Sequence, residues 1–155
     1  MPKAIPEGYH SVTPTLTFKD ARKAIDFYKK ALGACERYVM PGPDGKGVMH
    51  AEIQIGDSIF MIMDENPQMQ NKSAETLRGS PVNFYIYLEN VDEAYKKATS
   101  AGAQSKMAVD DMFWGDRVGT VQDLFGYSWS LATHVKDMTA KEIEEAAKVA
   151  FRKAA

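Results

Sequence analysis

The feature that most constrains this chain is one pattern that occurs twice, at an offset of 70 residues, in segments 12–24 and 82–94. Each segment opens with strict alternation of side-chain character, which predicts a half-buried β-strand. Each then reaches Asp20 or Asn90, whose side-chain oxygen predicts the start of a helix. Small and apolar residues continue at helical spacing and end at Gly33 or Gly102, as expected for a helix C-terminus. The repeat therefore predicts two copies of one strand-helix unit.

The segments after the two predicted helices are also similar. The first copy continues with predicted strands at 36–40, 48–55 and 58–64, and the second with strands at 104–109, 117–122 and 127–134. Glycine, proline and aspartate mark the turns between them. Each copy thus has the predicted order βαβββ, and the fold class is α+β with two such modules.

We expect one domain over residues 1–155, with the modules at 9–65 and 81–135. The polar segment 66–80 is predicted to be a plain connector, with a lid as the alternative. A helix is predicted at 138–154, because Thr139 and Glu142 have the spacing of a capping box. We expect this C-terminal helix to serve in packing or dimerisation.

Composition excludes several classes of partner. The chain carries 19 basic and 21 acidic side chains without a block of like charge, so we expect no nucleic acid partner. The longest aliphatic and aromatic run, Ile59 to Met63, is too short to span a bilayer, and we expect no membrane contact. Cys35 has no partner for an internal disulfide and is expected to be a small buried residue. Without an apolar leader, a cytoplasmic location is expected.

Several short motifs carry a resemblance to a known family that covers nearly the whole chain. They are Ala24-Ile-Asp-Phe-Tyr28, His50-Ala-Glu52, Gly56-Asp-Ser58, Phe113-Trp-Gly-Asp-Arg117 and Asp123-Leu-Phe-Gly-Tyr-Ser-Trp129. Together they resemble the vicinal oxygen chelate superfamily, which includes glyoxalase I and bleomycin resistance proteins, and within it the PhnB-like branch. Leu124 and Tyr127 depart from the proline and histidine more usual in that branch. The resemblance implies curled mixed sheets around a concave site, and a homodimer.

The resemblance also implies where a catalytic metal would bind in the enzymes of the family. The matching positions here are Thr13, Asn83 and Ser130, with Met61 or Ile62 as the fourth. Hydroxyl, amide and apolar side chains are poor ligands for Zn²⁺, Ni²⁺ or Fe²⁺. We therefore predict no metal and no cofactor, and we do not expect glyoxalase I chemistry.

His50 and Glu52 are the candidate catalytic residues. They alternate with Ala51 and Ile53, so both project from one face of a strand. A histidine oriented by a carboxylate can act as an acid-base pair. A relocated metal would need a third ligand, and the sequence offers only His10 and His134 beyond the pair. The alternative is that the two side chains bond each other, or a ligand, on a solvated face.

Trp114 and Arg117 are the most distinctive candidates for ligand binding. An indole ring can stack on an aromatic ligand, and a guanidinium can bind an anionic group. The alternative is a local ion pair between Asp116 and Arg117, with Trp114 capping the sheet. The predicted pocket is rich in neutral donors and aromatic faces, and its lining is Thr13, Thr15, Asn83, Tyr85, Trp114, Arg117, Gln122 and Ser130.

Two functions remain open from the sequence. The first is a binding protein that holds a small aromatic or anionic molecule in a metal-free pocket. The second is an enzyme of lyase, isomerase or dioxygenase type, which would act on a small oxygenated metabolite through a relocated metal or through His50 and Glu52. A homodimer is expected in both cases. The sequence leaves open whether the modules pair within one chain or between two chains.

Overall fold

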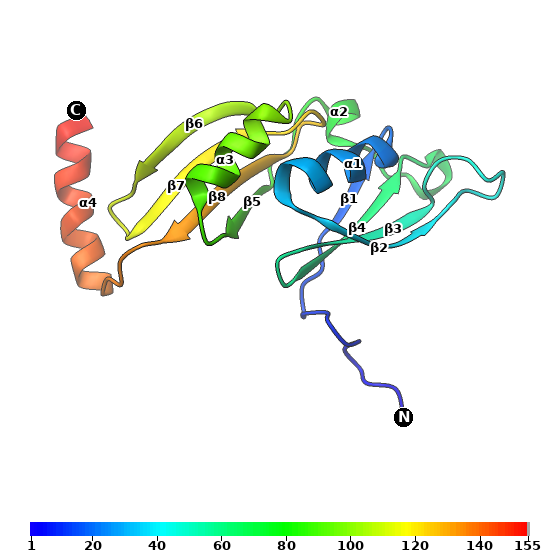
Figure 1. The fold of residues 1–155 in the computed structure, drawn as a ribbon, viewed down its shortest axis with the longest axis horizontal. Coiled ribbons are helices and arrows are strands. Elements are labelled where there is room, and N and C mark those ends of the chain that lie inside the picture. Colours follow the sequence, from blue (N-terminus) through cyan, green and yellow to red (C-terminus); the bar gives the residue numbers. More distant parts are fainter. Residues whose placement is uncertain (155) are drawn as a thin grey trace.

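The computed structural model describes residues 1–154 and contains the two predicted βαβββ modules (Figure 1). The first module consists of β1 (Thr15–Phe18), α1 (Ala21–Leu32), β2 (Cys35–Met40), β3 (His50–Ile55) and β4 (Ser58–Asp64). The second consists of β5 (Asn83–Tyr87), α3 (Val91–Ser100), β6 (Gln104–Asp111), β7 (Asp116–Gln122) and β8 (Ser128–His134). The connection holds η1 (Pro67–Met69) and α2 (Ala74–Leu77), and α4 (Ala140–Ala154) comes after the second module.

Each module forms its own four-stranded mixed sheet. The strand orders are β1-β4-β3-β2 and β5-β8-β7-β6, so the two modules have the same topology. In each sheet the first strand pairs in parallel with the last, and the remaining pairs are antiparallel. β1 and β5 are consequently edge strands, each with one neighbour in its sheet.

The helix boundaries coincide with the predicted capping residues. The side chains of Asp20 and Asn90 accept hydrogen bonds from the backbone N–H groups of Lys23 and Glu93. Gly33 closes α1 in the left-handed conformation, with φ of 65°, which a residue with a side chain adopts less readily.

The core lies where the helix-covered sides of the two modules meet. Phe18 and Tyr28 of the first module make edge-to-face ring contacts with Phe125, and Trp129 packs on Tyr28. Such aromatic packing stabilises the folded state beyond simple burial. Trp129 and Leu131 are almost fully buried, which confirms their predicted packing beneath the helices.

The connecting segment 66–80 is docked against the modules. Glu65 accepts hydrogen bonds from the backbone N–H and the hydroxyl of Ser73, both at 2.7 Å. A side chain at Gly126 would meet the Cβ atom of Ala74 at 3.3 Å, so α2 lies directly against the β7–β8 turn.

α4 lies at the far end of the second sheet (Figure 1). Its predicted capping box is confirmed, because the Glu142 carboxylate accepts from the Thr139 N–H while the Thr139 hydroxyl accepts from the Glu142 N–H. No described residue of α4 is buried, and Phe151 contacts the ring of Phe113 at a centroid distance of 5.8 Å. Among the helices in residues 1–154, none has the length and apolar character needed to cross a membrane.

The prediction of a buried Cys35 is wrong. Cys35 opens β2, an edge strand whose first four residues are exposed. β2 has only β3 as a neighbour in the sheet, so a small residue at the start of this edge strand gains little burial.

Candidate functional site

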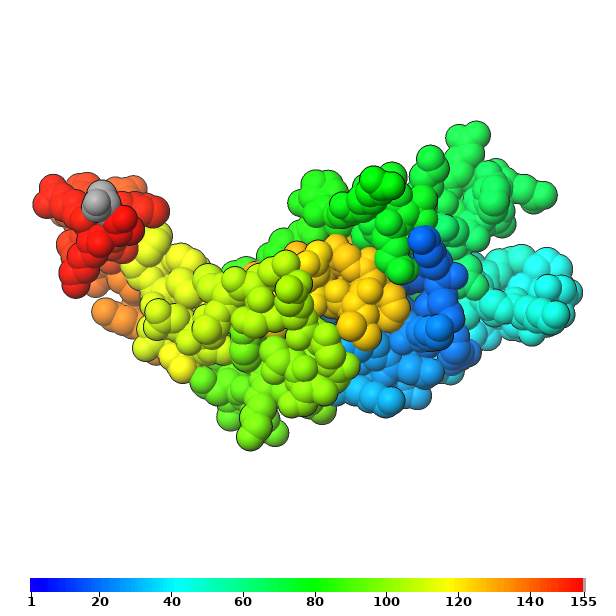
Figure 2. Space-filling model, turned by 90° about the horizontal axis from the view of Figure 1, so that it is seen from above, coloured from blue at the N-terminus to red at the C-terminus, as the bar shows by residue number. Residues whose placement is uncertain are grey.

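Each sheet has one face against the helices and one face turned away from them. On the second sheet we call the latter the second open face, and its residues are Asn83, Tyr85, Tyr87, Asp116, Thr120, Gln122, Ser130 and His134, which share one side by strand register. Figure 2 shows the surface hollowed between α4 (red) and the connecting segment (green), on the side away from α1 and α3. This hollow and the residues beneath it are the candidate site.

Neutral hydrogen-bonding groups occupy the middle of the second open face. The Asn83 side-chain N–H donates to the Ser130 hydroxyl at 3.0 Å, and the Ser130 and Thr120 hydroxyls are also 3.0 Å apart. Ser130 is 7% exposed, whereas Asn83 is exposed at the rim. The chain of three groups fixes their positions and leaves the Asn83 amide oxygen for a ligand.

Asp116 organises one end of the second open face. Its carboxylate accepts from the hydroxyls of Tyr85 at 2.7 Å and Tyr87 at 3.0 Å, from the Trp114 indole at 3.2 Å and from His134 Nδ1 at 2.8 Å. Burial alone would raise the pKa of Asp116, but these donors outweigh burial and hold the pKa below its usual value. The result is a shielded carboxylate that stays ionised and orients four side chains.

His134 connects Asp116 to a cavity of about 460 Å³ between the second sheet and the start of α4. Its Nε2 atom lies 2.9 Å from the carboxylate of Asp137, whose side chain is fully exposed. The hydrogen bonds to Asp116 and Asp137 raise the pKa of His134. These hydrogen bonds therefore favour the protonated imidazole, with one nitrogen facing the cavity.

Sequence reasoning misses Asp116, His134 and Asp137 as members of one site. It offers Asp116 only as a partner of Arg117, and His134 only as a distant third metal ligand. The signal that could have linked them is the pairing of β7 with β8, whose antiparallel register places Asp116 directly beside His134. The turn at 123–126 alone does not fix this register, so the sequence does not predict the pair.

Arg117 lies on the other face of β7, against α3. Its guanidinium donates to both carboxylate oxygens of Asp92, at 2.9 and 2.8 Å, and to Asp111 at 3.1 Å. The alternative of a local ion pair between Asp116 and Arg117 is not observed, since consecutive strand residues point to opposite faces. The structure thus separates Arg117 from Trp114, and we leave Arg117 out of the proposed pocket.

The first sheet has a matching first open face, with Thr15, His50, Glu52, Gln54 and Met61 on one side by register. His50 Nε2 lies 3.5 Å from Glu52, a long separation for a hydrogen bond. The Tyr9 hydroxyl lowers the pKa of Glu52, burial opposes this, and His50 adds to the lowering. Arg37 covers the Tyr9 ring at 5.8 Å, so the N-terminal segment lies over this part of the face.

The donor set does not fit a resident transition metal at the family positions. Asn83 and Ser130 bond each other, and the fourth position is Met61, because Ile62 is fully buried on the opposite side of β4. Thr13 precedes β1 on the other sheet. Within residues 1–154, no three His, Cys, Asp or Glu side chains are grouped so that they could hold a metal ion. We therefore derive no chemistry through a metal.

The predicted pocket residues divide between the two sheets. Asn83, Tyr85, Gln122 and Ser130 lie together on the second open face, and Trp114 borders it through Asp116. Thr15 lies on β1, with Thr13 just before it, and both belong to the first sheet. Within one chain the predicted lining residues therefore form two half-sets, one on each sheet, and not one continuous pocket.

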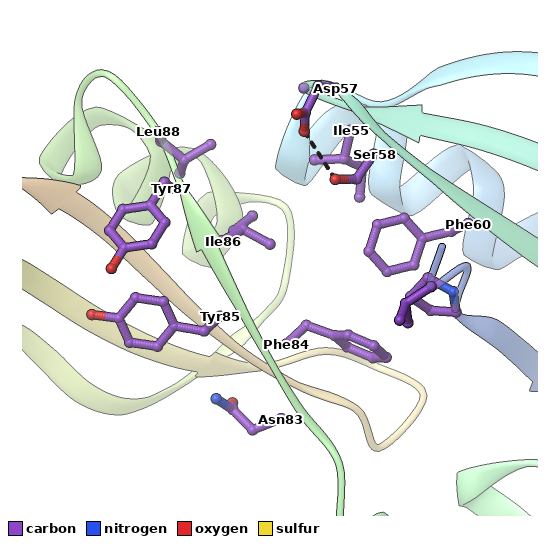
Figure 3. Close-up of a pocket in the computed structure, with 13 residues that line it drawn as sticks. Ile55, Asp57, Ser58, Phe60, Asn83, Phe84, Tyr85, Ile86, Tyr87 and Leu88 are labelled. Carbon is purple, nitrogen blue, oxygen red and sulfur yellow. Dashed lines mark hydrogen bonds between the residues drawn. The ribbon is translucent and has the colours of Figure 1, made fainter. Parts of the chain in front are cut away.

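A cavity of about 700 Å³ lies along the edge strand β5. Figure 3 shows Phe84 and Ile86 projecting from β5 toward Phe60 and Ile55 of the first module, whereas Tyr85 and Tyr87 project to the other side. The cavity is therefore mainly an apolar cleft between the modules, next to the unpaired edge of a strand.

Comparison with known proteins places the chain in a family. Residues 10–131 match the model of the Glyoxalase/Bleomycin resistance protein/Dioxygenase superfamily, and the chain belongs to this superfamily. The uncharacterized protein Rv0887c of Mycobacterium tuberculosis is 40% identical over 139 residues, which cover 88% of this chain and 81% of that protein.

Solved structures show the same fold. TioX from Micromonospora sp. ML1 has a TM-score of 0.65 at 23% identity, over 81% of this chain and 99% of TioX. The PhnB protein from Bacillus cereus has a TM-score of 0.61 at 19% identity, over 80% of this chain and 99% of that chain. The predicted superfamily is confirmed by the family model and the fold class by the solved structures, whereas the PhnB-like branch stays a prediction.

Proposed function

We propose that this protein binds a small, flat organic molecule on the second open face, and that a second copy of the chain closes the site. The observation that carries the proposal is the composition of that face. Asn83, Thr120 and Ser130 form a fixed neutral network next to the aromatic side chains ordered by Asp116. Such a surface offers stacking and directed hydrogen bonds, which suit binding better than activation of water.

Two features support closure by a second copy. β1 and β5 are edge strands, and edge strands favour pairing with another chain. The cleft beside β5 adds an apolar surface that includes Phe84, Ile86 and Leu88. We propose that the first open face of one subunit covers the second open face of its partner, which would join the two half-sets of predicted lining residues in one cavity.

We further propose that binding needs no resident metal. The support is chemical, because Thr13, Asn83, Ser130 and Met61 supply no imidazole, carboxylate or thiolate. Thermal unfolding with and without a chelator tests this part. A chelator-sensitive melting temperature together with near-stoichiometric bound metal would contradict it.

The binding proposal is tested with 2-naphthol, a flat neutral aromatic probe, by equilibrium dialysis together with sedimentation equilibrium. We expect a dimer that binds one probe per subunit. Asn83→Ala removes the exposed member of the network, and we expect it to weaken binding at least tenfold. Glu145→Gln is the matched control, because Glu145 pairs only with Lys148 on α4 among the described residues. A monomer, or equal affinity for Asn83→Ala and the control, would contradict the proposal.

A second candidate function rests on His50 and Glu52. Both side chains are partly buried on the first open face, and Glu52 has a lowered pKa, so it can orient a neutral or charged imidazole. We propose this pair as the acid-base group if the protein turns over an oxygenated substrate. His50→Gln would then abolish the turnover, and unchanged turnover in that variant would exclude the role.

A further inference from the structure

The cavity between the second sheet and the start of α4 has an oriented imidazole at its base, and its wall combines aromatic and apolar side chains with carboxylates. We infer that this cavity takes a small organic carboxylate, whose acid group replaces the carboxylate of Asp137 on Nε2 of His134. The inference rests on the proposed function in one respect, because it takes the second open face as the ligand side. It adds the chemical class of the ligand and names the residue that binds its charged group.

His134 is held in one fixed direction. Its Nδ1 atom lies 2.8 Å from Asp116, a carboxylate whose side chain is only 4% exposed. Asp116 is itself held by Tyr85, Tyr87 and Trp114, so the carboxylate has little freedom to turn. A histidine pinned in this way presents its other nitrogen in one direction, as in sites where a carboxylate orients an imidazole for ligand contact.

A carboxylate already occupies the position on Nε2 of His134. The Asp137 oxygen lies 2.9 Å from Nε2, yet the Asp137 side chain is fully exposed and belongs to the irregular stretch between β8 and α4. Exposed ion pairs of this kind contribute little to stability and exchange readily with solvent or other ions. Asp137 therefore shows the geometry of a bound acid while remaining easy to displace.

Part of the cavity wall is aromatic and apolar. Tyr87, Trp114, Met138 and Ile143 line it, and they present rings and apolar side chains. The Tyr87 O–H and the Trp114 N–H both donate to Asp116, so neither is free to donate to a ligand. A ligand that fits these walls has one charged end and a compact aromatic or branched apolar body.

The other carboxylate at the rim, Glu142, is already held by hydrogen bonds. Glu142 also lines the cavity, but its carboxylate accepts from the N–H and hydroxyl of Thr139 at the start of α4. The hydrogen bonds from Thr139 lower the pKa of the Glu142 carboxyl, and the charge of Lys136 adds to the lowering. A bound acid adds one negative charge to the cavity, and the fully exposed Asp137 side chain can move its displaced carboxylate into solvent.

The experiment uses benzoate as the probe, with benzamide and benzylammonium as neutral and cationic analogues of similar size. Titration calorimetry at pH 6.5 on the full chain gives the affinities. We expect benzoate to bind at least tenfold more tightly than either analogue. Equal binding of benzamide, or tighter binding of benzylammonium, would overturn the inference.

Removing the Asp137 carboxylate, which competes with the ligand for Nε2 of His134, gives a sharper test. In Asp137→Ala the Nε2 atom has no carboxylate to displace, so we expect benzoate to bind three- to tenfold more tightly than to the wild type. Glu145→Gln removes one acid from the neighbouring helix without touching the cavity and is the matched control for net charge. Unchanged or weaker benzoate binding to Asp137→Ala, or the same gain in the control, would overturn the inference.

Histidine resonances in the same titration identify the residue that binds the acid. We expect benzoate to shift the ring signals of His134 and to leave those of His50 unchanged. Shifts confined to His50 would overturn the inference. The 2-naphthol assay separates the two proposals, since its success with failure of benzoate overturns only the carboxylate site, whereas loss of both overturns the open face as the ligand side.

Discussion

Asp116 begins β7 and Asp123 directly follows its last residue. Each carboxylate accepts four hydrogen bonds, but the two have different structural roles. Asp123 accepts from Tyr28 and Trp129 and from the backbone N–H groups of Phe125 and Tyr127, so it ties the two modules together. Asp116 accepts only from side chains of the second module, including one in the segment just before β7, and it lies beside the open cavity.

The difference is also electrostatic. Both residues are shielded, at 6% exposure for Asp123 and 3% for Asp116, but Asp123 is surrounded by the joint core whereas Asp116 lies just beneath an open surface. Burial raises the pKa of Asp123 despite its donors, while the donors of Asp116, including His134, lower its pKa despite burial. A carboxylate that accepts four hydrogen bonds can therefore either hold two modules together or orient the side chains of a binding site, depending on what surrounds it.

The largest effect is expected from truncating the two carboxylates. Asp123→Ala leaves two side-chain and two backbone donors unpaired in the core, and we expect a loss of about 3–5 kcal/mol in the free energy of unfolding. Asp116→Ala should cost about 1–3 kcal/mol, because water can reach the released donors from the open face. Urea unfolding measures both. A cost for Asp116→Ala equal to that for Asp123→Ala would remove the distinction between joint and site.

The two tryptophans differ in the same way as the two carboxylates, with smaller expected changes in the free energy of unfolding. Each indole N–H donates to one of the carboxylates, Trp129 to Asp123 at 2.9 Å and Trp114 to Asp116 at 3.2 Å. We expect Trp129→Phe to cost about 2–3 kcal/mol, since it loses both core volume and a buried donor. Trp114→Phe should cost less than about 1 kcal/mol and should instead weaken ligand binding. The reverse order in urea unfolding would contradict the account.

The pH dependence of stability tests the role of His134. Its pKa is raised in the folded state by Asp116 and Asp137, with Tyr87 and Glu142 also facing the cavity. A raised folded pKa stabilises the protein fully below the unfolded value of about 6.5, and this contribution is lost as pH rises through the folded pKa.

The stability difference between wild type and His134→Gln should therefore be larger at pH 5.5 than at pH 9. Urea unfolding of both proteins at the two pH values gives this difference directly. A difference that grows with pH would mean that the imidazole is held in its neutral form, contrary to the geometry around Asp116.

The smallest effect is expected at Arg117. Its contacts with Asp92 and Asp111 lie at the surface on the helix side of β7, where ion pairs contribute little. Arg117→Ala should leave the affinities for 2-naphthol and benzoate within twofold of the wild-type values in the dialysis and calorimetry assays. A tenfold loss would return Arg117 to the ligand site.

The sequence is sufficient to predict the modules but only part of the site. Period-two alternation and the caps at Asp20 and Asn90 predict strands and helix starts, because both depend on local chemistry. The same alternation places Asn83, Tyr85 and Ser130 correctly on one face. The Asp116 cluster depends on pairing between strands whose register is set by tertiary packing, and Asp137 approaches His134 through a loop. The prediction for Cys35 fails for the same reason, since exposure depends on which strand lies at the edge.

The central claim is that each site combines the first open face of one subunit with the second open face of the other. Met61→Glu disables the first face, and Tyr87→Glu disables the second, at positions that are half-buried and exposed in the single chain. Each variant alone should lose 2-naphthol binding. In a dimer that contains one copy of each, one site receives both changes and the other receives neither.

The decisive measurement is therefore the number of 2-naphthol molecules bound by mixed dimers of Met61→Glu and Tyr87→Glu, purified with a different tag on each chain. The account predicts one intact site per mixed dimer, with the affinity of the wild type. Mixed dimers that bind no probe, like either variant alone, would show that each site is built within a single chain and would contradict the account.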